Sequence, residues 1–261
     1  MISSFSKIAA IALAATMGTA ATAQDLQVGA NIGNVPWEFQ DDTGANVGFE
    51  VDLVNAVAEK LGRGVEIVNI PFQGLFSAVQ SGRVDIAMSS ITITQERLES
   101  VTFAQPYYDR DQSLTVAADG PASLDEMSGK VVGVDTGSTG DMWATENAAE
   151  YGFATINRYE GLAPAMLDLA AGRIAGYISD IPALQYYVKD KPELKVVQRI
   201  ATGEAYSMMF AKDAPLATEV NDVLSALKED GTVAALHEKW FGATPEDTTS
   251  TVTVMDMPTL N

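Results

Sequence analysis

The stretch SGRVDIAMSSITITQER, residues 81–97, joins an apolar segment to a polar turn and ends on Arg97. Residues 84–88 are predicted to form a buried strand, and Thr94 is placed to cap a helix that begins after the turn. The turn carries three hydroxyl side chains, those of Ser89, Ser90 and Thr92. Hydroxyls, free backbone N–H groups and one guanidinium around a small space are what a carboxylate needs. The alternative is that Arg97 is an ordinary arginine on the helix surface.

A second stretch, AGRIAGYISDIPAL at residues 171–184, repeats this layout, with Asp180 where the first stretch has Ser90. Ligands of open α/β sheets bind beyond the carboxyl ends of the strands, so two facing lobes would place Arg97 and Asp180 across one cleft. A cation and an anion together suit the carboxylate and the ammonium of a free amino acid. Chance similarity of two α/β units, and a role of Asp180 as a helix cap, remain open alternatives.

Short apolar runs alternate with helical periodicity along the whole chain, which predicts an α/β fold. Strands are expected at 28–32, 65–70, 84–88, 114–116, 131–134 and 174–178. Helices are expected at 51–61, 75–79, 140–150, 163–171 and, broken at Gly231, 215–241.

The amino terminus has the composition of a signal peptide, with one lysine, an apolar run and a small-residue site that predicts cleavage after Ala23. The run is too short to span a bilayer. Export of residues 24–261 to the periplasm is therefore expected. The chain has no cysteine, which excludes disulfides and thiolate metal sites. Its net charge of −19 argues against nucleic acid and anionic membranes as partners.

Further candidate residues lie in loops between the expected elements. The turn at residues 136–140 contains Ser138 and Thr139, which can contact a ligand or simply cap the next helix. Trp37 and Phe72 could stack on an apolar ligand stem, although aromatic residues more often belong to the core. His237, the single histidine, is expected to be structural. No pattern for nucleophilic or zinc catalysis is present, so we expect no enzyme activity, no cofactor and no metal.

Four segments carry a resemblance to a known family: GFEVDLVNAVAEKL at 48–61, PFQGLFSAVQSGRVDIAMSSITITQER at 71–97, FAQPYY at 103–108 and KWFG at 239–242. The chain resembles the family 3 periplasmic solute-binding proteins, the polar amino-acid receptors of ABC importers. The resemblance implies a two-lobed periplasmic-binding-protein fold (type II), with lobes joined by two crossing strands. Lobe 1 would be 24–109 plus 206–243, lobe 2 would be 112–201, and 244–261 would be a polar, extended or mobile extension.

The resemblance also implies roles for single residues. Arg97 would bind the ligand's α-carboxylate, and Asp180 would take the α-ammonium. Phe72 would stack on the ligand. The carboxylate would be helped by hydroxyls at Ser90, Thr92, Ser138 and Thr139.

Departures from the family pattern bear on which amino acid binds. Asn31 stands where the family often has aspartate, and Asn34 stands where it has an aromatic residue. Together with Trp37 they suggest amide hydrogen bonds and a neutral polar ligand. Asp135, where glutamine-binding relatives have lysine, or Glu38 could instead replace the missing negative charge, which leaves a cationic amino acid or a derivative as the alternative.

The predicted function is capture of a free amino acid by a monomer, and its delivery to an inner-membrane ABC permease. One rival is a cyclohexadienyl dehydratase-like enzyme on the same fold, in which Glu38 or Asp135 would protonate a leaving hydroxyl. A second rival is a receptor that signals through a partner protein.

Overall fold

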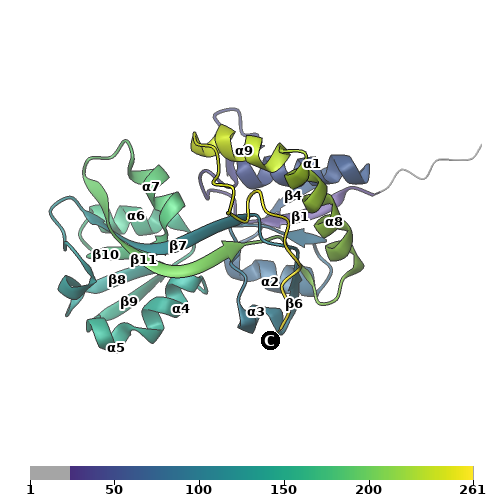
Figure 1. Ribbon diagram of the computed structural model, residues 1–261. Helices are drawn as coiled ribbons and strands as arrows, with labels where there is room; N and C mark the ends of the chain where they lie inside the picture. Colours follow the sequence, from purple (N-terminus) through teal and green to yellow (C-terminus); the bar gives the residue numbers. More distant parts are fainter. Residues whose placement is uncertain (1–23, 261) are drawn as a thin grey trace, which may run out of the picture.

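Two five-stranded sheets divide the residues that the structure describes, 24–260, into two lobes (Figure 1). The computed structural model joins the lobes through the antiparallel pair of long strands β7 (Tyr108–Ala117) and β11 (Leu194–Tyr206). This confirms the predicted α/β fold and its two lobes joined by two strands. The predicted signal peptide, residues 1–23, lies outside the described residues.

The sheet of lobe 1 has the order β4-β1-β5-β12-β6, in which β4, β1 and β5 are parallel and β12 is antiparallel to its neighbours. Its strands are β1 (Leu26–Ala30), β4 (Val65–Asn69), β5 (Ile86–Ala87), β6 (Val101–Phe103) and β12 (Met209–Ala211). Its helices are α1 (Phe49–Leu61), α2 (Phe72–Gln80), α3 (Gln95–Leu98), α8 (Pro215–Glu229) and α9 (Thr232–Phe241). A small hairpin joins β2 (Phe39–Gln40) to β3 (Asn46–Val47).

The sheet of lobe 2 has the order β11-β7-β10-β8-β9. Besides the two connecting strands it contains β8 (Val131–Asp135), β9 (Thr155–Tyr159) and β10 (Gly176–Asp180). Its helices are α4 (Thr139–Glu146), α5 (Ala148–Tyr151), α6 (Leu162–Ala170), α7 (Ile181–Val188) and the short 3₁₀ helix at Leu124–Met127. Among residues 24–260, no helix is long and apolar enough to cross a membrane.

The internal repeat forms the same unit in both lobes. Helix α2 ends before Gly82 and leads into β5, and helix α6 ends before Gly172 and leads into β10. Both glycines adopt the left-handed conformation, with φ of 71° and 70°. A residue without Cβ takes this conformation at little cost, which explains the Gly-Arg pair at the same point of each repeat. The strand predicted at 84–88 is shorter in the structure, where only Ile86 and Ala87 pair with β1 and form β5.

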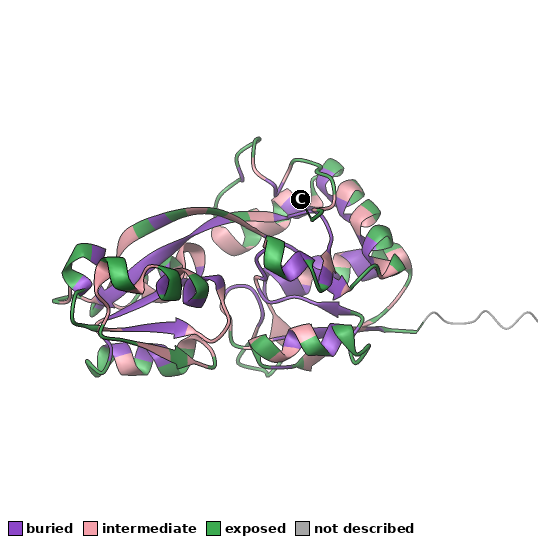
Figure 2. Ribbon diagram, turned by 90° about the horizontal axis from the view of Figure 1, so that it is seen from below, coloured by how far each residue is buried: buried purple, intermediate pink, exposed green. Residues whose placement is uncertain are grey.

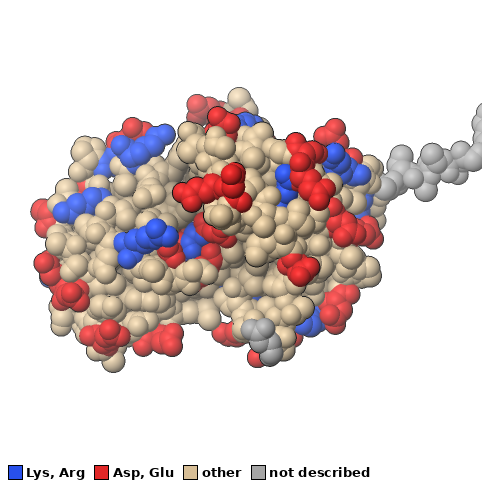
Figure 3. All heavy atoms as spheres, in the orientation of Figure 1, with Lys and Arg blue, Asp and Glu red and all other residues tan. Residues whose placement is uncertain are grey.

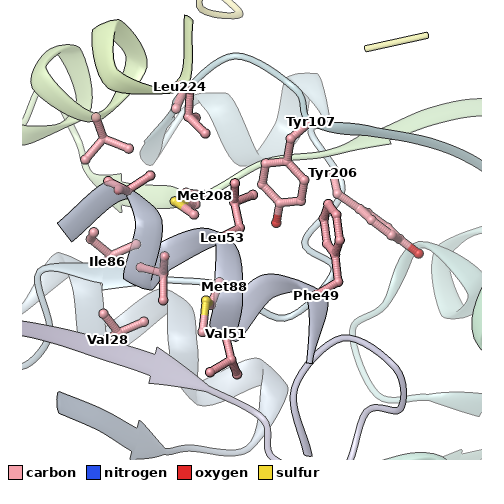
Figure 4. Packing of buried hydrophobic residues seen from close by; sticks show 14 of the residues in the cluster. Val28, Phe49, Val51, Leu53, Ile86, Met88, Tyr107, Tyr206, Met208 and Leu224 are labelled. Atoms are coloured by element: carbon pink, nitrogen blue, oxygen red, sulfur yellow. The ribbon is translucent and has the colours of Figure 1, made fainter. Parts of the chain in front are cut away.

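Each lobe has its own buried core, seen as purple inward faces of helices and strands in Figure 2. In lobe 1, Phe49 of α1 packs beside Tyr107, which precedes β7, and Tyr206, which ends β11 (Figure 4). Acidic side chains outnumber basic ones on the face shown in Figure 3, as the negative net charge requires. The aromatic packing fixes the ends of the connecting strands on lobe 1.

The polar residues after α9 form a strap that packs on lobe 1 and ends beside α3 (Figure 1). The strap, residues 244–260, is held near its middle. The Ser250 N–H donates to Asp109 Oδ2 at 2.8 Å, and Lys228 Nζ donates to the Thr253 carbonyl at 2.9 Å. Lys228 is buried, and burial lowers its pKa to about 8. The extension is therefore packed on the body, with turns at residues 247–253.

Deleting residues 244–261 is expected to lower the melting temperature of the protein by roughly 5 °C. The deletion takes one acceptor from the buried Lys228 and exposes the surface under Ser250 and Thr251, which together lower the free energy of unfolding by about 2 kcal/mol. In a chain of this size each kcal/mol lowers the melting temperature by about 2–4 °C. Circular dichroism melting measures the change. Deleting only 258–261 is the matched control, since it leaves the bonds of Ser250 and Thr253 intact, and equal melting temperatures for the two deletions would contradict a stabilising strap.

Candidate functional site

A cavity of about 140 Å³ lies between the lobes, at the carboxyl ends of β1, β5, β8 and β10. Loops from both lobes line it, as expected for an open α/β sheet whose strands end at a cleft. The cavity brings together ten of the eleven residues predicted from the sequence: Asn31, Asn34, Phe72, Ser89, Ser90, Thr92, Arg97, Ser138, Thr139 and Asp180.

Trp37 is the exception, because it does not line the cavity. Its side chain is fully buried in lobe 1, and its ring meets the rings of Phe49, Tyr108 and Tyr206 edge-on at 4.6 to 5.6 Å between centroids. A large apolar ring gains most free energy in a closed aromatic cluster. Trp37 therefore belongs to the core beside the connecting strands.

Arg97 presents its guanidinium to the cavity from α3. Thr94 caps this helix as predicted, its Oγ1 accepting from the Arg97 N–H at 3.1 Å. Nη1 donates to the Thr92 carbonyl at 2.7 Å, and Nη2 donates to the Gly137 carbonyl of lobe 2 at 3.1 Å. Burial, helped by the charge of Arg110, lowers the pKa of Arg97 to about 10. The group stays charged at neutral pH and can bind a carboxylate.

The rings of Phe72 and Phe76 support the same guanidinium. Its central carbon lies 5.6 Å from the Phe72 ring centroid and 5.1 Å from that of Phe76. Contacts of a cation with aromatic faces restrict its position. Phe72 thus borders the cavity and also holds Arg97.

Two buried glutamates hold the Ser89–Ser90 turn from beneath. Glu38 Oε1 accepts from Ser89 Oγ at 2.5 Å and from Asn34 Nδ2 at 3.0 Å. Glu50 accepts from the Ser90 N–H at 2.9 Å and from the Tyr107 hydroxyl. Burial, together with the charge of Glu50, raises the pKa of Glu38 well above its ordinary value, and burial raises the pKa of Glu50. Burial thus favours the protonated form of both carboxyls.

Ser90 adopts a left-handed backbone with φ of 44°, which is unusual for a residue with a side chain. Glu50 stabilises this backbone by accepting from the Ser90 N–H with both oxygens. The Asn34 amide also donates to Ser90 Oγ at 2.9 Å. With both of its N–H groups engaged by Glu38 and Ser90, Asn34 offers its carbonyl oxygen as an acceptor for a ligand.

Lobe 2 contributes Ser138, in the turn before α4, and Thr139, the first residue of that helix. Ser138 caps α4, since its Oγ accepts from the Asp141 N–H at 3.1 Å, so the capping alternative for this turn is confirmed. Thr139 Oγ1 lies 3.5 Å from Thr92 Oγ1 of lobe 1 and accepts from Gln112 Nε2 at 3.0 Å. This turn and the one after β5 meet across the cleft.

Asp180 occupies the cap position of α7, but its side chain makes no cap bond. It forms an ion pair with Arg110 instead, with 2.6 Å between Oδ1 and Nη1. Oδ1 also accepts from Gln112 Nε2 at 2.9 Å, and Oδ2 accepts from the Tyr206 hydroxyl. The alternative interpretation of Asp180 as a helix-capping side chain is therefore wrong.

Arg110 is a cavity residue that the sequence analysis did not identify. It lies in β7, is 5% exposed, and pairs with Glu204 of β11 as well as with Asp180. It also donates to Thr139 Oγ1 at 2.7 Å and lies over the Tyr206 ring. No motif marked it, because its partners come from distant parts of the chain.

Two acids of lobe 2, Asp135 and Glu160, also line the cavity. Asp135 ends β8 and accepts from the Gly161 N–H at 2.9 Å. Burial raises its pKa to about 6, and no ion pair within residues 24–260 includes it or Glu160. A carboxylate in such surroundings favours a cationic partner.

The profile of the family described as "Bacterial extracellular solute-binding proteins, family 3" matches residues 26–243, which include both lobes and every cavity residue. The chain belongs to this family.

Among relatives of this family 3 protein is the arginine-binding extracellular protein ArtP of Bacillus subtilis. The two are 31% identical over 229 residues, covering 86% of this chain and 89% of ArtP. A solved structure of an ancestral arginine-binding protein bound to arginine has a TM-score of 0.80 and 34% identity, covering 85% of this chain and 100% of that one.

A second solved structure similar to this family 3 protein is an ancestral amino acid-binding protein, AncCDT-1, described as a precursor of cyclohexadienyl dehydratase. It has a TM-score of 0.76 and 34% identity, and the alignment covers 83% of this chain and 95% of that one. The chain is accordingly an amino-acid-binding protein of an ABC transporter. The individual amino acid differs between relatives and has to be argued from the cavity.

Proposed function

We propose that this protein captures a cationic amino acid in the periplasm and delivers it, as a monomer, to an ABC permease. The observation that carries the proposal is the half-buried Asp135 carboxylate, which lines the cavity without a cationic partner among residues 24–260. Glu160 adds a second negative charge to the same wall. Asn31 stands where the family often has aspartate, and in this proposal Asp135 and Glu160 of lobe 2 supply that negative charge instead.

In this proposal the ligand is held at both ends and the protein performs no chemistry on it. Arg97 binds the carboxylate, helped by Thr92 and the hydroxyls of the turn before α4. The distal cation lies near Asp135, and Phe72 borders the stem. Charged hydrogen bonds contribute about 1.5–3 kcal/mol each, so three or four of them, less the costs of ordering and desolvation, suffice for micromolar affinity.

The periplasmic location and the permease partner rest on the family, whose members are described as extracellular solute-binding proteins, and on the predicted signal peptide. Capture without catalysis is supported by the relatives, since ArtP and AncCDT-1 are both named as binding proteins. A neutral polar ligand, favoured by Asn31 and Asn34, is the rival that the experiment distinguishes.

The test is calorimetry of ligand-stripped protein, residues 24–261, with L-arginine, L-lysine and L-glutamine. Arginine or lysine should bind at least tenfold more tightly than glutamine. Asp135→Asn should weaken the cationic ligand by about tenfold or more and leave glutamine unchanged, because only the cation loses a charged partner. Asp125→Asn, at an exposed aspartate, is the matched control.

The affinity should also depend on pH. Because the pKa of Asp135 is raised to about 6, the carboxylate is protonated as the pH falls through 6, and the affinity for a cation falls with it. The raised pKa of Asp135 also affects stability. The ligand-free protein should lose stability as the pH rises from about 3.8, the ordinary pKa of aspartate, through about 6, because the folded state binds more protons than the unfolded one. Tighter binding of glutamine than of both cations would overturn the proposal in favour of a neutral ligand.

A further inference from the structure

Arg110 places a buried positive charge where the two lobes and the two connecting strands meet. It reaches Asp180 of β10, Glu204 of β11, Thr139 of α4 and Thr92 of lobe 1. With 5% of its surface exposed and its guanidinium over the Tyr206 ring, the side chain is fixed by the fold. Since Arg110 also lines the cavity, its charge acts on any ligand there.

The carboxylate of Asp180 is already occupied by groups of the protein. Gln112 and Tyr206 donate hydrogen bonds to its two oxygens, and Arg110 forms an ion pair with Oδ1. A carboxylate has about four acceptor positions, of which two are used by these hydrogen bonds while Arg110 lies against Oδ1. The guanidinium, which also pairs with Glu204, offsets part of the charge of Asp180 and so weakens its attraction for a second cation.

Arg97 and Arg110 line one cavity, and each charge acts on the other: Arg110 contributes to the lowered pKa of Arg97. An anion between two guanidinium groups relieves their repulsion, whereas an ammonium beside Arg110 adds to it. The cavity therefore favours a carboxylate between the two guanidinium groups, and it offers an α-ammonium only an Asp180 carboxylate that is already paired with Arg110.

We propose that Arg110 takes the place of the ligand's α-ammonium as the partner of Asp180, so that the site recognises its ligand by the carboxylate and the distal cation. This inference rests on the proposed function and widens its ligand class. Carboxylic acids with a distal amino or guanidino group bind whether or not they carry an α-ammonium.

Pairs of ligands that differ only in the α-ammonium test the proposal by calorimetry on the wild-type protein. The pairs are L-arginine with 5-guanidinopentanoic acid, L-lysine with 6-aminohexanoic acid, and L-glutamine with glutaramic acid. Within the pair that binds best, the compound without the α-ammonium should bind within about fivefold of its parent, whereas a lost charged hydrogen bond would cost about tenfold or more. A loss of about tenfold or more overturns the role of Arg110.

The design separates this inference from the proposed function. If only the glutamine pair binds, the cationic ligand is wrong, and the ratio within that pair still decides the role of Arg110. If a cationic parent binds and its analogue does not, the cationic ligand holds and the role of Arg110 is overturned.

A double variant tests whether the tolerance for a missing α-ammonium depends on Arg110. Arg110→Met combined with Glu204→Gln removes one positive and one negative charge, and it frees Asp180 for an ammonium. The affinity ratio of parent to analogue should rise by about tenfold or more over that of the wild type. Arg173→Met, at a surface arginine of lobe 2 that pairs with Asp168, is the control and should leave the ratio unchanged. A purely structural role of Arg110 would weaken both ligands equally, and an unchanged ratio in the double variant overturns the proposal.

Discussion

Replacing Arg97 by alanine should weaken binding of the preferred amino acid by at least about a hundredfold. Two charge-assisted hydrogen bonds to a carboxylate contribute about 3–6 kcal/mol together, and each 1.4 kcal/mol is a factor of ten in affinity. The substitution also removes the donor to the Gly137 carbonyl, which links the lobes at the edge of the cavity. Calorimetry with the ligand identified for the wild-type protein measures the loss.

Loss of affinity has meaning only if the variant stays folded. Thr94 still caps α3 through the backbone N–H of residue 97, which alanine retains, so the circular dichroism spectrum should be unchanged. Arg83→Ala, at the exposed arginine of the same repeat, should bind normally. An Arg97→Ala variant that binds within a few-fold of the wild type would show that the carboxylate is held elsewhere.

Replacing Glu50 by alanine should lower the free energy of unfolding by about 3 kcal/mol or more. The Tyr107 hydroxyl and the Ser90 N–H would both lose their acceptor in a buried place, and each unsatisfied group costs about 1–3 kcal/mol. The left-handed backbone of Ser90 would also lose its support. Urea denaturation followed by fluorescence measures the change.

Glu50→Gln separates the loss of hydrogen bonds from the loss of charge. Glutamine keeps an acceptor for Tyr107 and Ser90 and does not repel Glu38, so its stability at pH 7 should be within about 1 kcal/mol of the wild type. Because the pKa values of Glu38 and Glu50 are raised, the wild type loses stability as the pH rises above about 4.5, the usual pKa of glutamate. This decline should be shallower in Glu50→Gln. Equal destabilisation by alanine and glutamine would contradict the role of Glu50 as an acceptor.

Residues that lie close together in the sequence were the ones that sequence analysis could place. The run at 81–97 contains a strand end, a hydroxyl-rich turn, a cap and an arginine, and local geometry alone brings these to one point. The repeat at 171–184 allowed the same prediction for lobe 2, because the same local sequence pattern forms the same helix–strand unit there. Ten of the eleven predicted residues consequently line one cavity, although their roles toward a ligand stay predictions.

The features that the sequence did not reveal depend on contacts between distant segments. Arg110 stands in a polar stretch of a connecting strand, where nothing local distinguishes it from a solvated arginine. Only the pairing of β7 with β10 and β11 brings Asp180 and Glu204 to it. Trp37 was misplaced for the corresponding reason, since the aromatic cluster that buries it forms only when the ends of the connecting strands pack on lobe 1.

The strap has a practical consequence for detecting ligands. Its last described residues lie beside α3, where the Gln95 side chain approaches the Thr259 carbonyl at 3.5 Å, two residues from Arg97 along the helix. Because the chain has no cysteine of its own, Thr259→Cys creates a single attachment point for a fluorescent dye. A dye there is outside the cavity yet borders the helix that carries Arg97, which makes the end of the strap a natural position for an optical reporter of amino-acid concentration.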